Sequence, residues 1–431
     1  MKIEKPKGTR DFYPEDMAWQ NYITDAWRRV SIRHGFEEVD GPIFEKLDLY
    51  KVKSGDGIVS ELFSFRRENG STDFALRPEF TPTLARMVAD RANSLPKPIK
   101  WFTIPNLCRA ERPQRGRLRE FLQWNVDLLG LESELADAET ILVAIDFLSE
   151  LGVTPEHVRV KISHRDVVKN ILITLGVPED KILDAFNLLD RRDKMESEDF
   201  EKAAMALGLD EHRVQRFQEA CRSRYRTGSL GSLCKAIGMP ETDVKELQEL
   251  DDKLHDLGIA EWCEYDLGIV RGLAYYTGVV YEIHESSGAE RALAGGGRYD
   301  NLINLFGGPK TPAVGFGMGD VVLSNLLRDK GLIPDHIGHR PDIYVLAVSD
   351  LGAKKVLPLV ADLRAKGLHA RFSYKTTKNM GRLLKEAVGA SSRYALILDD
   401  APESGQLKNL DTQEQVEVRL DEVAKTLHDA V

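Results

Sequence analysis

Cysteine is scarce in this chain of 431 residues, and its spacing excludes the sites that cysteine usually builds. No two of the four cysteines have the Cys-x-x-Cys spacing of a zinc site or redox motif (Cys108, Cys221, Cys234 and Cys263). A disulfide framework is therefore not indicated. No apolar stretch approaches the roughly 18 residues that a membrane helix needs. Residues 1–5 lack the apolar core of a signal peptide, so we expect a cytoplasmic protein without membrane association.

Positive charge is also in deficit, because 69 acidic residues outnumber 59 lysines and arginines and the formal net charge is -10. This balance argues against non-specific binding to nucleic acid. Any RNA contact would have to come from two local clusters, with five arginines in residues 109–119 and seven lysines or arginines in residues 364–385. A basic cluster taken alone is more often a solvated face. The length and the 42% hydrophobic content indicate a globular protein of two or three domains.

Residues 98–129 predict two strands joined by a loop at residues 109–119, which we call the basic loop. In the second strand, alternate side chains point to opposite faces of the sheet. One face is apolar and must pack on a core, and it carries Leu122, Trp124, Val126 and Leu128. The other face carries Phe121, Gln123, Asn125 and Asp127. Three polar residues and a ring in a row suit the floor of a binding site, although a solvent-exposed sheet face explains the pattern equally well.

The hydrophobic pattern changes several times along the chain. An amphipathic helix is expected at residues 17–34 and a helix that covers the sheet at residues 133–151, and residues 165–258 have the helical spacing of an inserted module. Strand patterning returns at residues 278–283. Prolines and glycines in residues 331–341 indicate a linker. Strands then alternate with helices, which predicts a small α/β domain around a mixed sheet.

The basic loop has the chemistry of a phosphate site. Arginine is permanently charged and presents a planar fork that matches phosphate oxygens. The loop lacks the Gly-x-x-x-x-Gly-Lys spacing of a P-loop, so a nucleotide site of another kind is expected. Phe121, directly after the loop, is placed to stack on a purine.

The same segment resembles a motif of a known family. Residues 107–111, Leu-Cys-Arg-Ala-Glu, followed by the basic loop and a strand, resemble motif 2 of the class II aminoacyl-tRNA synthetases. Residues 112–121 resemble the histidyl-tRNA synthetase family in particular. The resemblance implies an ATP site with Arg109 at the α-phosphate, Glu111 and Phe121 at the adenine, and Arg117 and Arg119 at the outer phosphates.

Further matches extend over nearly the whole chain. Residues 7–14, Lys-Gly-Thr-Arg-Asp-Phe-Tyr-Pro, resemble the N-terminal signature of the family. Residues 35–45 resemble motif 1, which forms the dimer interface in this class, so a homodimer is implied. Residues 76–81 resemble the amino-acid-binding strand and turn. By this resemblance, the α-ammonium group of the substrate is received by Glu79, Thr81 and Gln123.

Two signatures resemble the histidyl enzyme rather than its class II relatives. They are Val-Arg-Gly-Leu-Ala-Tyr-Tyr at residues 270–276 and Ala-Gly-Gly-Gly-Arg-Tyr-Asp at residues 294–300. They imply a pocket around the imidazole of L-histidine, formed by Asp127, Tyr275, Tyr276 and Tyr299. A carboxylate can fix one ring N–H, and tyrosine can pair with the other nitrogen. Such a pocket rejects analogues that leave its buried polar groups unpaired.

Arg271, in the first of these signatures, receives the most specific role. The resemblance implies that it contacts the histidine and, with Arg109, holds the α-phosphate from opposite sides. A fixed cation stabilises the charge that develops at phosphorus without reorganisation. The pair would also hold the histidine carboxylate in line for attack. Mg²⁺ is expected with the leaving pyrophosphate, and no protein side chain is assigned to it.

The chain departs from the family pattern at two positions. Ala274 stands where aspartate is usual, and Val322 stands where motif 3 has an arginine for the γ-phosphate. We expect Arg117 or Arg119, together with Mg²⁺, to serve the γ-phosphate instead.

The sequence therefore predicts an α+β protein. A class II synthetase catalytic domain on an antiparallel sheet is expected over residues 1–330, with a helical insertion at about 165–258. A C-terminal α/β domain at 341–431 resembles an anticodon-binding domain, and its basic face fits RNA.

The expected function is ATP-dependent ligation of L-histidine to tRNA(His) through a histidyl-adenylate. One alternative is a catalytically inactive relative that regulates and binds histidine or tRNA; another is a different class II synthetase with the same C-terminal domain. Arg109, Arg271 and the basic loop favour an enzyme, and the two histidyl signatures count against the third interpretation.

Overall fold

The computed structural model describes residues 3–54, 56–192, 195–222, 224–269, 276–288, 290–334, 336–375 and 377–429. The chain divides into two compact units, Met1–Asp335 and His336–Val431. Each unit has a hydrophobic core of its own. Among the described helices, none combines the length and the apolar character needed to cross a lipid bilayer.

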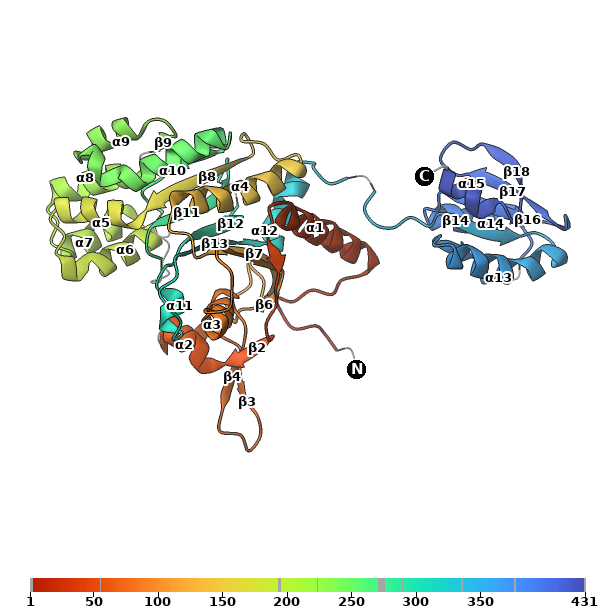
Figure 1. Ribbon diagram of the computed structural model, residues 1–431, viewed down its shortest axis with the longest axis horizontal. Helices are drawn as coiled ribbons and strands as arrows, with labels where there is room; N and C mark the ends of the chain where they lie inside the picture. The colour runs from red at the N-terminus through yellow and green to blue at the C-terminus, as the bar shows by residue number, and fades with distance from the viewer. Residues whose placement is uncertain are drawn as a thin grey trace. The chain divides into compact units, whose positions relative to one another are not determined.

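A ten-stranded sheet of described residues forms the centre of the first unit (Figure 1). Its six middle strands run antiparallel in the order β5 (Ile99–Thr103), β7 (Glu120–Leu129), β13 (Ala313–Gly319), β12 (Ala294–Arg298), β11 (Val279–Glu285) and β8 (Val158–His164). The outer strands are β1 (Glu37–Glu38), β10 (Cys263–Tyr265) and β9 (Tyr225–Arg226), and β6 (Asn106–Cys108) pairs with β7. The predicted antiparallel sheet is thus confirmed.

One face of the sheet is covered by α1 (Pro14–Arg33), α4 (Glu134–Glu150) and α12 (Asp320–Asp329). Trp27 of α1, Trp124 of β7 and Phe147 of α4 meet in this core, with ring centroids 5.3 to 6.0 Å apart. The indole Nε1 of Trp124 donates to Oγ of Ser31 at 2.9 Å, which satisfies a buried polar group. The apolar face predicted for β7 therefore packs on a core, as expected.

Six α-helices of the described residues lie between β8 and β10 in the chain and gather at one end of the sheet (Figure 1). They are α5 (Arg165–Thr174), α6 (Ile182–Arg191), α7 (Ser197–Ala206), α8 (Glu211–Arg222), α9 (Leu230–Ile237) and α10 (Lys245–Asp256). Their apolar side chains continue the core of the sheet, and α10 packs on α4. The helical character expected for this part of the chain is confirmed.

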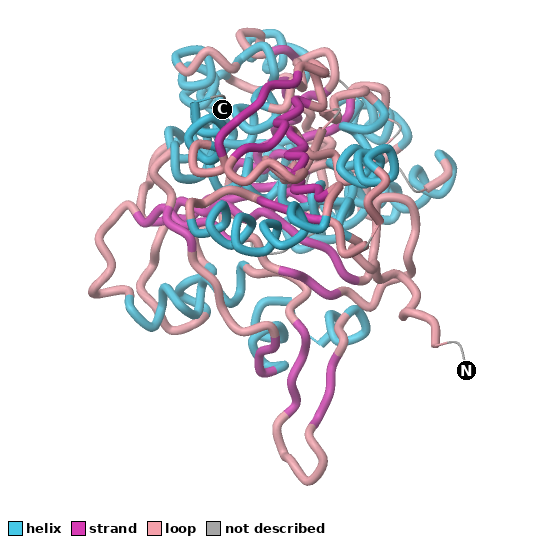
Figure 2. The backbone as a smooth tube through the Cα atoms, turned by 90° about the vertical axis from the view of Figure 1, so that its right-hand side faces the viewer, coloured by secondary structure: helices cyan, strands magenta, loops and turns pink. Residues whose placement is uncertain are grey.

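The opposite face of the sheet carries α3 (Thr81–Arg91) and α11 (Leu302–Leu305) over a smaller apolar cluster. Next to them, α2 (Leu47–Ser54) packs on a three-stranded sheet of β2 (Phe44–Lys46), β4 (Asp73–Leu76) and β3 (Ser64–Arg66). Figure 2 shows the β3–β4 hairpin projecting away from the main sheet.

The second unit is a five-stranded mixed sheet. Its order is β15 (Ala370–Phe372), β14 (Ile343–Ala347), β16 (Tyr394–Leu398), β17 (Ser404–Asn409) and β18 (Gln415–Arg419), parallel through β16 and antiparallel after it. The helices are α13 (Asp350–Ala365), α14 (Met380–Gly389) and α15 (Val423–Asp429). The expected mixed sheet is confirmed, but β17 was missed because Ser-Gly-Gln-Leu-Lys-Asn has no β-branched or aromatic residue.

Candidate active site

A cavity of about 400 Å³ opens above β7, on the sheet face turned away from α1 and α4. Of the residues predicted for the site, those that line it are Glu79, Thr81, Arg109, Glu111, Arg117, Phe121, Gln123, Asp127, Tyr276 and Tyr299. Arg119 is not in the lining. Arg271 and Tyr275 lie outside the described residues. Segments far apart in the sequence thus converge on one space.

The floor of the cavity is the polar face of β7. Phe121, Gln123, Asn125 and Asp127 all line it, so the alternation predicted for this strand is confirmed. Room for these side chains comes from glycines on the neighbouring strand β13. A Cβ on Gly315 would lie 2.1 Å from Oδ1 of Asp127, and a Cβ on Gly317 would lie 2.8 Å from Cδ of Gln123. Side chains at these two positions would collide with the floor.

Asp127 and Tyr299 form a buried polar pair at one end of the floor. The Tyr299 hydroxyl donates to Oδ1 of Asp127, and both residues are buried. Burial raises the pKa of Asp127 to about 7, and the hydrogen bond from Tyr299 opposes this rise. Tyr276 is also buried against the cavity, where a Cβ on Gly297 would lie 3.0 Å from its ring. The result is a small pocket with one carboxyl group and two phenols.

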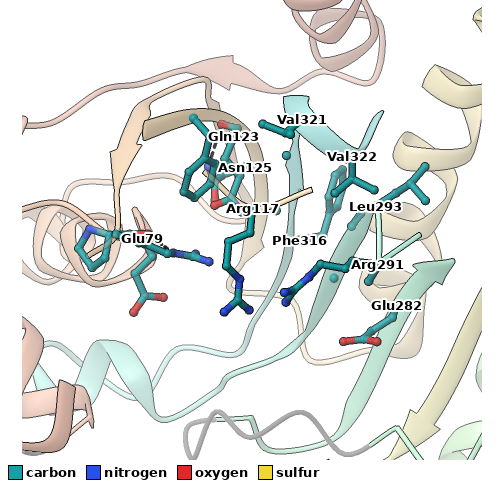
Figure 3. A pocket seen from close by; sticks show the side chains of 18 of the residues that line it. Glu79, Arg117, Gln123, Asn125, Glu282, Arg291, Leu293, Phe316, Val321 and Val322 are labelled. Carbon is teal, nitrogen blue, oxygen red and sulfur yellow. Dashed lines mark hydrogen bonds between the residues drawn. The ribbon is translucent and has the colours of Figure 1, made fainter. Parts of the chain in front are cut away.

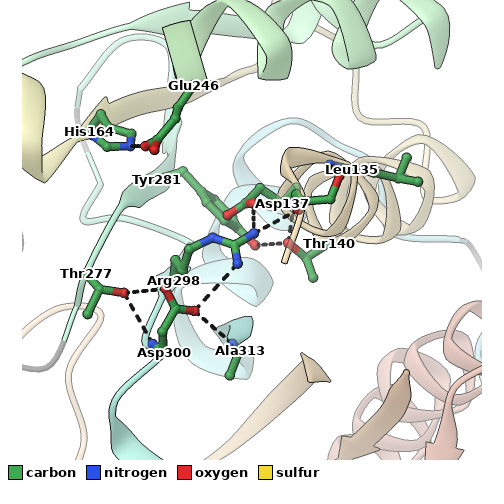
Figure 4. Close-up of polar contacts among 11 residues, drawn as sticks. Leu135, Asp137, Thr140, His164, Glu246, Thr277, Tyr281, Arg298, Asp300 and Ala313 are labelled. Atoms are coloured by element: carbon green, nitrogen blue, oxygen red, sulfur yellow. Dashed lines mark hydrogen bonds and ion pairs between the residues drawn. The ribbon is translucent and has the colours of Figure 1, made fainter. Parts of the chain in front are cut away.

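The remaining polar residues of segment 294–300 brace the sheet (Figure 4). Arg298 forms an ion pair with buried Asp137 of α4 and donates to the Ser133 carbonyl oxygen at 2.9 Å. Asp300 accepts hydrogen bonds from the Ala313 amide at 3.0 Å and from the Thr277 hydroxyl at 3.1 Å. Of the polar side chains in this segment, Tyr299 is therefore the one that lines the cavity.

The basic loop contributes two guanidinium groups to the cavity wall. Nε of Arg109 donates to the Pro78 carbonyl oxygen at 2.9 Å, and its guanidinium carbon lies 5.0 Å from the centroid of the Phe121 ring. Nη1 of Arg117 lies 2.8 Å from Oε1 of Glu111. The other oxygen of Glu111 is buried and has no hydrogen-bond partner among the described residues. A buried acceptor left in this state suits a ligand that donates a hydrogen bond.

Arg119 points away from the cavity, toward the N-terminal segment. Its guanidinium donates to the carbonyl oxygens of Glu111 at 3.3 Å and Lys7 at 3.4 Å. Its backbone N–H donates to the Gly8 carbonyl at 2.8 Å. Gly8 has a φ of +88°, and a Cβ there would lie 2.6 Å from Cγ of Pro113. The N-terminal signature thus packs directly on the basic loop.

A second contact ties the N-terminal signature to the floor. Arg10 forms an ion pair with Asp320 at 2.7 Å, and the Asp320 side chain is 1% exposed. The other oxygen of Asp320 accepts from the backbone N–H of Leu122 at 3.1 Å. Burial raises the pKa of Asp320, and the charge of Arg10 opposes this. One carboxylate therefore links α12, β7 and the N-terminal segment.

Three charged residues of the lining were missed from the sequence: Glu61, Glu282 and Arg291. Arg291 and Glu282 face the cavity from the side of Val322 (Figure 3). The available signal was the charged pair Glu290-Arg291 shortly before the glycine-rich strand β12. Burial and the nearby charge of Arg117 lower the pKa of Arg291. The described residues contain no group of three or more side chains suited to hold a metal ion.

Comparison with known proteins gives a consistent result. The sequence profile of the histidyl-tRNA synthetase family matches residues 8–320, and that of an anticodon binding domain matches residues 342–429. A histidine--tRNA ligase of Opitutus terrae is 36% identical, with 98% of this chain and 97% of the relative covered. One of Thermoplasma volcanium is 35% identical, with 99% of each covered. The solved histidyl-tRNA synthetase of Nostoc sp. PCC 7120 has the same fold, with a TM-score of 0.83, 23% identity and full coverage of both chains.

Proposed function

Because the chain belongs to the histidyl-tRNA synthetase family and joins histidine to tRNA, we propose that histidine is activated by ATP in the cavity above β7. The observation that carries the proposal is the convergence of two features in one cavity. The Asp127–Tyr299 pair forms a pocket for a small polar ring, and the Arg109 and Arg117 guanidinium groups lie on the same lining.

The histidine side chain binds in the pocket of Asp127, Tyr276 and Tyr299. A carboxyl group with a pKa of about 7 can accept a hydrogen bond from an imidazole N–H, and a phenol can pair with the second ring nitrogen. A phenylalanine side chain would place an apolar ring against this carboxyl group and these phenols without offering a hydrogen bond, which costs far more than the loss of a methyl contact. The α-ammonium group binds at the outer end of the floor, to Glu79, Thr81 and Gln123.

ATP binds along the basic loop. Its adenine stacks on Phe121, and its exocyclic amino group donates to the oxygen of Glu111 that is buried without a partner among the described residues. Arg109 is held by the Pro78 carbonyl and needs little reorganisation to contact the α-phosphate. Arg117 lies farther along the loop, toward the outer phosphates, where it would exchange its contact with Glu111 for a phosphate.

The reaction has two displacements. A carboxylate oxygen of histidine attacks the α-phosphorus, the bond to the bridging oxygen breaks, and pyrophosphate leaves. A hydroxyl of the terminal adenosine of the tRNA then attacks the carbonyl carbon, AMP leaves with the bonding electron pair, and the hydroxyl proton is released to water. Positioning and fixed positive charge carry both steps. The family resemblance assigns a share of that charge to Arg271.

Mg²⁺ belongs to this proposal as a companion of the nucleotide. The described residues form no cluster that would hold a metal ion alone. Mg²⁺ is commonly bound by one or two carboxylates together with substrate phosphates, and Glu282 is the carboxylate on the wall beside Arg291. The bound ion would neutralise charge on the leaving pyrophosphate.

The partners follow from the same proposal. We assign tRNA(His) as the acceptor, with its anticodon region at the C-terminal unit, and we place the protein in the cytoplasm as a homodimer. The alternative of an inactive regulatory relative is not favoured by any of these observations on the described residues. Arg109 and Arg117 of the basic loop lie on the cavity wall, and the matches to histidine--tRNA ligases cover nearly the whole length of both proteins.

Amino-acid-dependent exchange of pyrophosphate into ATP tests the function directly. The purified full-length chain should support exchange with histidine and not with the other nineteen amino acids. Exchange with a different amino acid would overturn the assignment of the pocket. Binding of histidine without any exchange would support the inactive alternative instead.

A further inference from the structure

Position 322 differs from the family pattern, and the structure shows what lies beside it. Val322 lines the cavity where the resemblance expects an arginine for the γ-phosphate. A Cβ built on Gly116 of the basic loop would lie 3.2 Å from Cγ2 of Val322 and 3.7 Å from Cδ of Arg291. Val322, Gly116 and Arg291 therefore meet at one corner of the cavity. Figure 3 shows Val322 and Arg291 there. Position 322 thus lacks the expected guanidinium group, and Arg291 supplies one at the same corner of the cavity.

The Arg291 side chain is available to a ligand. No hydrogen bond or ion pair joins its guanidinium to any residue that the structure describes. The charges that act on it are those of Arg117 and Arg109, which lower its pKa, and those of Glu111 and Glu282, which raise it. Several guanidinium groups around one open space favour a ligand with several negative charges.

The segment that carries Arg291 is held in place by the adjacent residue, Glu290. Glu290 forms an ion pair at 2.5 Å with Arg115 of the basic loop, and Arg115 also contacts Asp329 of α12 at 3.0 Å. The Glu290 side chain is buried, so this contact joins the loop, the segment before β12 and α12. Gly116 directly follows Arg115, and its lack of a side chain leaves space beside the stem of Arg291.

We propose that Arg291 binds the γ-phosphate of ATP in place of the motif 3 arginine that Val322 replaces. The inference rests on the proposed function and names a phosphate-binding residue that the family pattern does not predict. Arg117 shares this end of the nucleotide, whereas Arg119 is directed to the backbone of the N-terminal segment and takes no part. A planar guanidinium can form two parallel hydrogen bonds to a terminal phosphate.

Nucleotides of different length test this assignment. Calorimetric titration without histidine should show that Arg291→Ala weakens ATP binding by about 10-fold to 100-fold, the range of a charge-assisted hydrogen bond. Binding of AMP, which lacks the outer phosphates, should stay within about twofold of wild type. Arg291→Lys keeps the positive charge but loses the planar fork of the guanidinium. Its affinity for ATP should therefore lie between those of wild type and Arg291→Ala. Arg328→Ala, an exposed arginine of α12, is the matched control.

Pyrophosphate exchange separates the inference from the function on which it rests. In Arg291→Ala the KM for ATP should rise by the factor by which ATP binding weakens, about 10-fold to 100-fold, while the KM for histidine is unchanged. An unaltered KM for ATP in an active Arg291→Ala enzyme would overturn the inference and leave the function intact. Absence of exchange in the wild type would overturn the function itself. Recovery of the ATP KM in the double variant Arg291→Ala/Val322→Arg would show that both positions serve the same phosphate.

Discussion

Tyr299, directly after β12, donates a hydrogen bond from its phenol to Asp127 of β7, and both residues line the cavity. The two residues are 172 positions apart in the chain. β13 lies between their strands, and its glycine at position 315 leaves the space in which they meet. The pair combines a carboxyl group that titrates near neutral pH with a phenol whose pKa burial raises well above its ordinary value.

The ionisation of Asp127 should make stability depend on pH. Its folded pKa of about 7 exceeds the ordinary value of 3.8, so the folded protein binds more protons than the unfolded chain between these values. Ionisation of Asp127 therefore does not lower the free energy of unfolding below about pH 4. Its destabilising effect grows as the pH rises from about 4 to about 7. Asp127→Asn removes this cost, which the pKa shift limits to the order of 4 kcal/mol.

Relative to wild type, Asp127→Asn should gain free energy of unfolding between pH 5 and pH 8 and lose affinity for histidine. Tryptophan fluorescence during urea unfolding reports on this, because all five tryptophans lie in the first unit. Asp180→Asn, at an exposed position, is the control. Equal pH dependence in wild type and Asp127→Asn would contradict the assignment of the titrating group.

A methyl group at position 315 should damage the histidine pocket. The Cβ of Gly315→Ala would lie 2.1 Å from Oδ1 of Asp127 and 2.6 Å from the Val126 carbonyl oxygen, which is backbone and cannot move aside cheaply. We expect a loss of stability of about 1 to 3 kcal/mol and a KM for histidine raised more than the KM for ATP. Gly389→Ala has open space around its Cβ and should leave both constants unchanged. Equal increases in both constants would argue against a specific effect on the histidine pocket.

The ion pair between Arg10 and Asp320 should couple the N-terminal signature to the floor of the site. Arg10→Ala leaves a buried carboxylate without its charged partner, and we expect it to cost on the order of 2 kcal/mol, less than a fully buried pair because Arg10 is partly exposed. Asp320→Asn in the same background should recover part of the loss. Thermal unfolding of the four proteins of this double-mutant cycle measures the coupling. Additive effects of the two substitutions would show that the contact contributes nothing.

Much of the fold was predictable from local pattern. The alternation of β7 has a period of two residues, which is a property of any strand, so its core face and its cavity face were assigned correctly without knowledge of the partners. The helical spacing in residues 165–258 likewise depends on the helix itself. β17 was not predicted, because it is stabilised by pairing with β16 and β18 rather than by the strand preference of its own residues.

The site was less predictable where a side chain's direction depends on distant contacts. Arg117 and Arg119 are equivalent in the sequence, yet Arg117 lines the cavity and Arg119 donates to Glu111 and Lys7. Arg291 had no sequence signal comparable to that of the basic loop.

By itself, the sequence determined the helical character of residues 165–258, the polar face of β7 and the family to which its motifs belong. These features reside in neighbouring residues, whose spacing is set by backbone geometry. The tertiary structure alone decided which guanidinium groups share the cavity and why glycines stand opposite Asp127 and Gln123. Those outcomes depend on excluded volume and on hydrogen bonds between segments that lie hundreds of residues apart, and no local pattern records them.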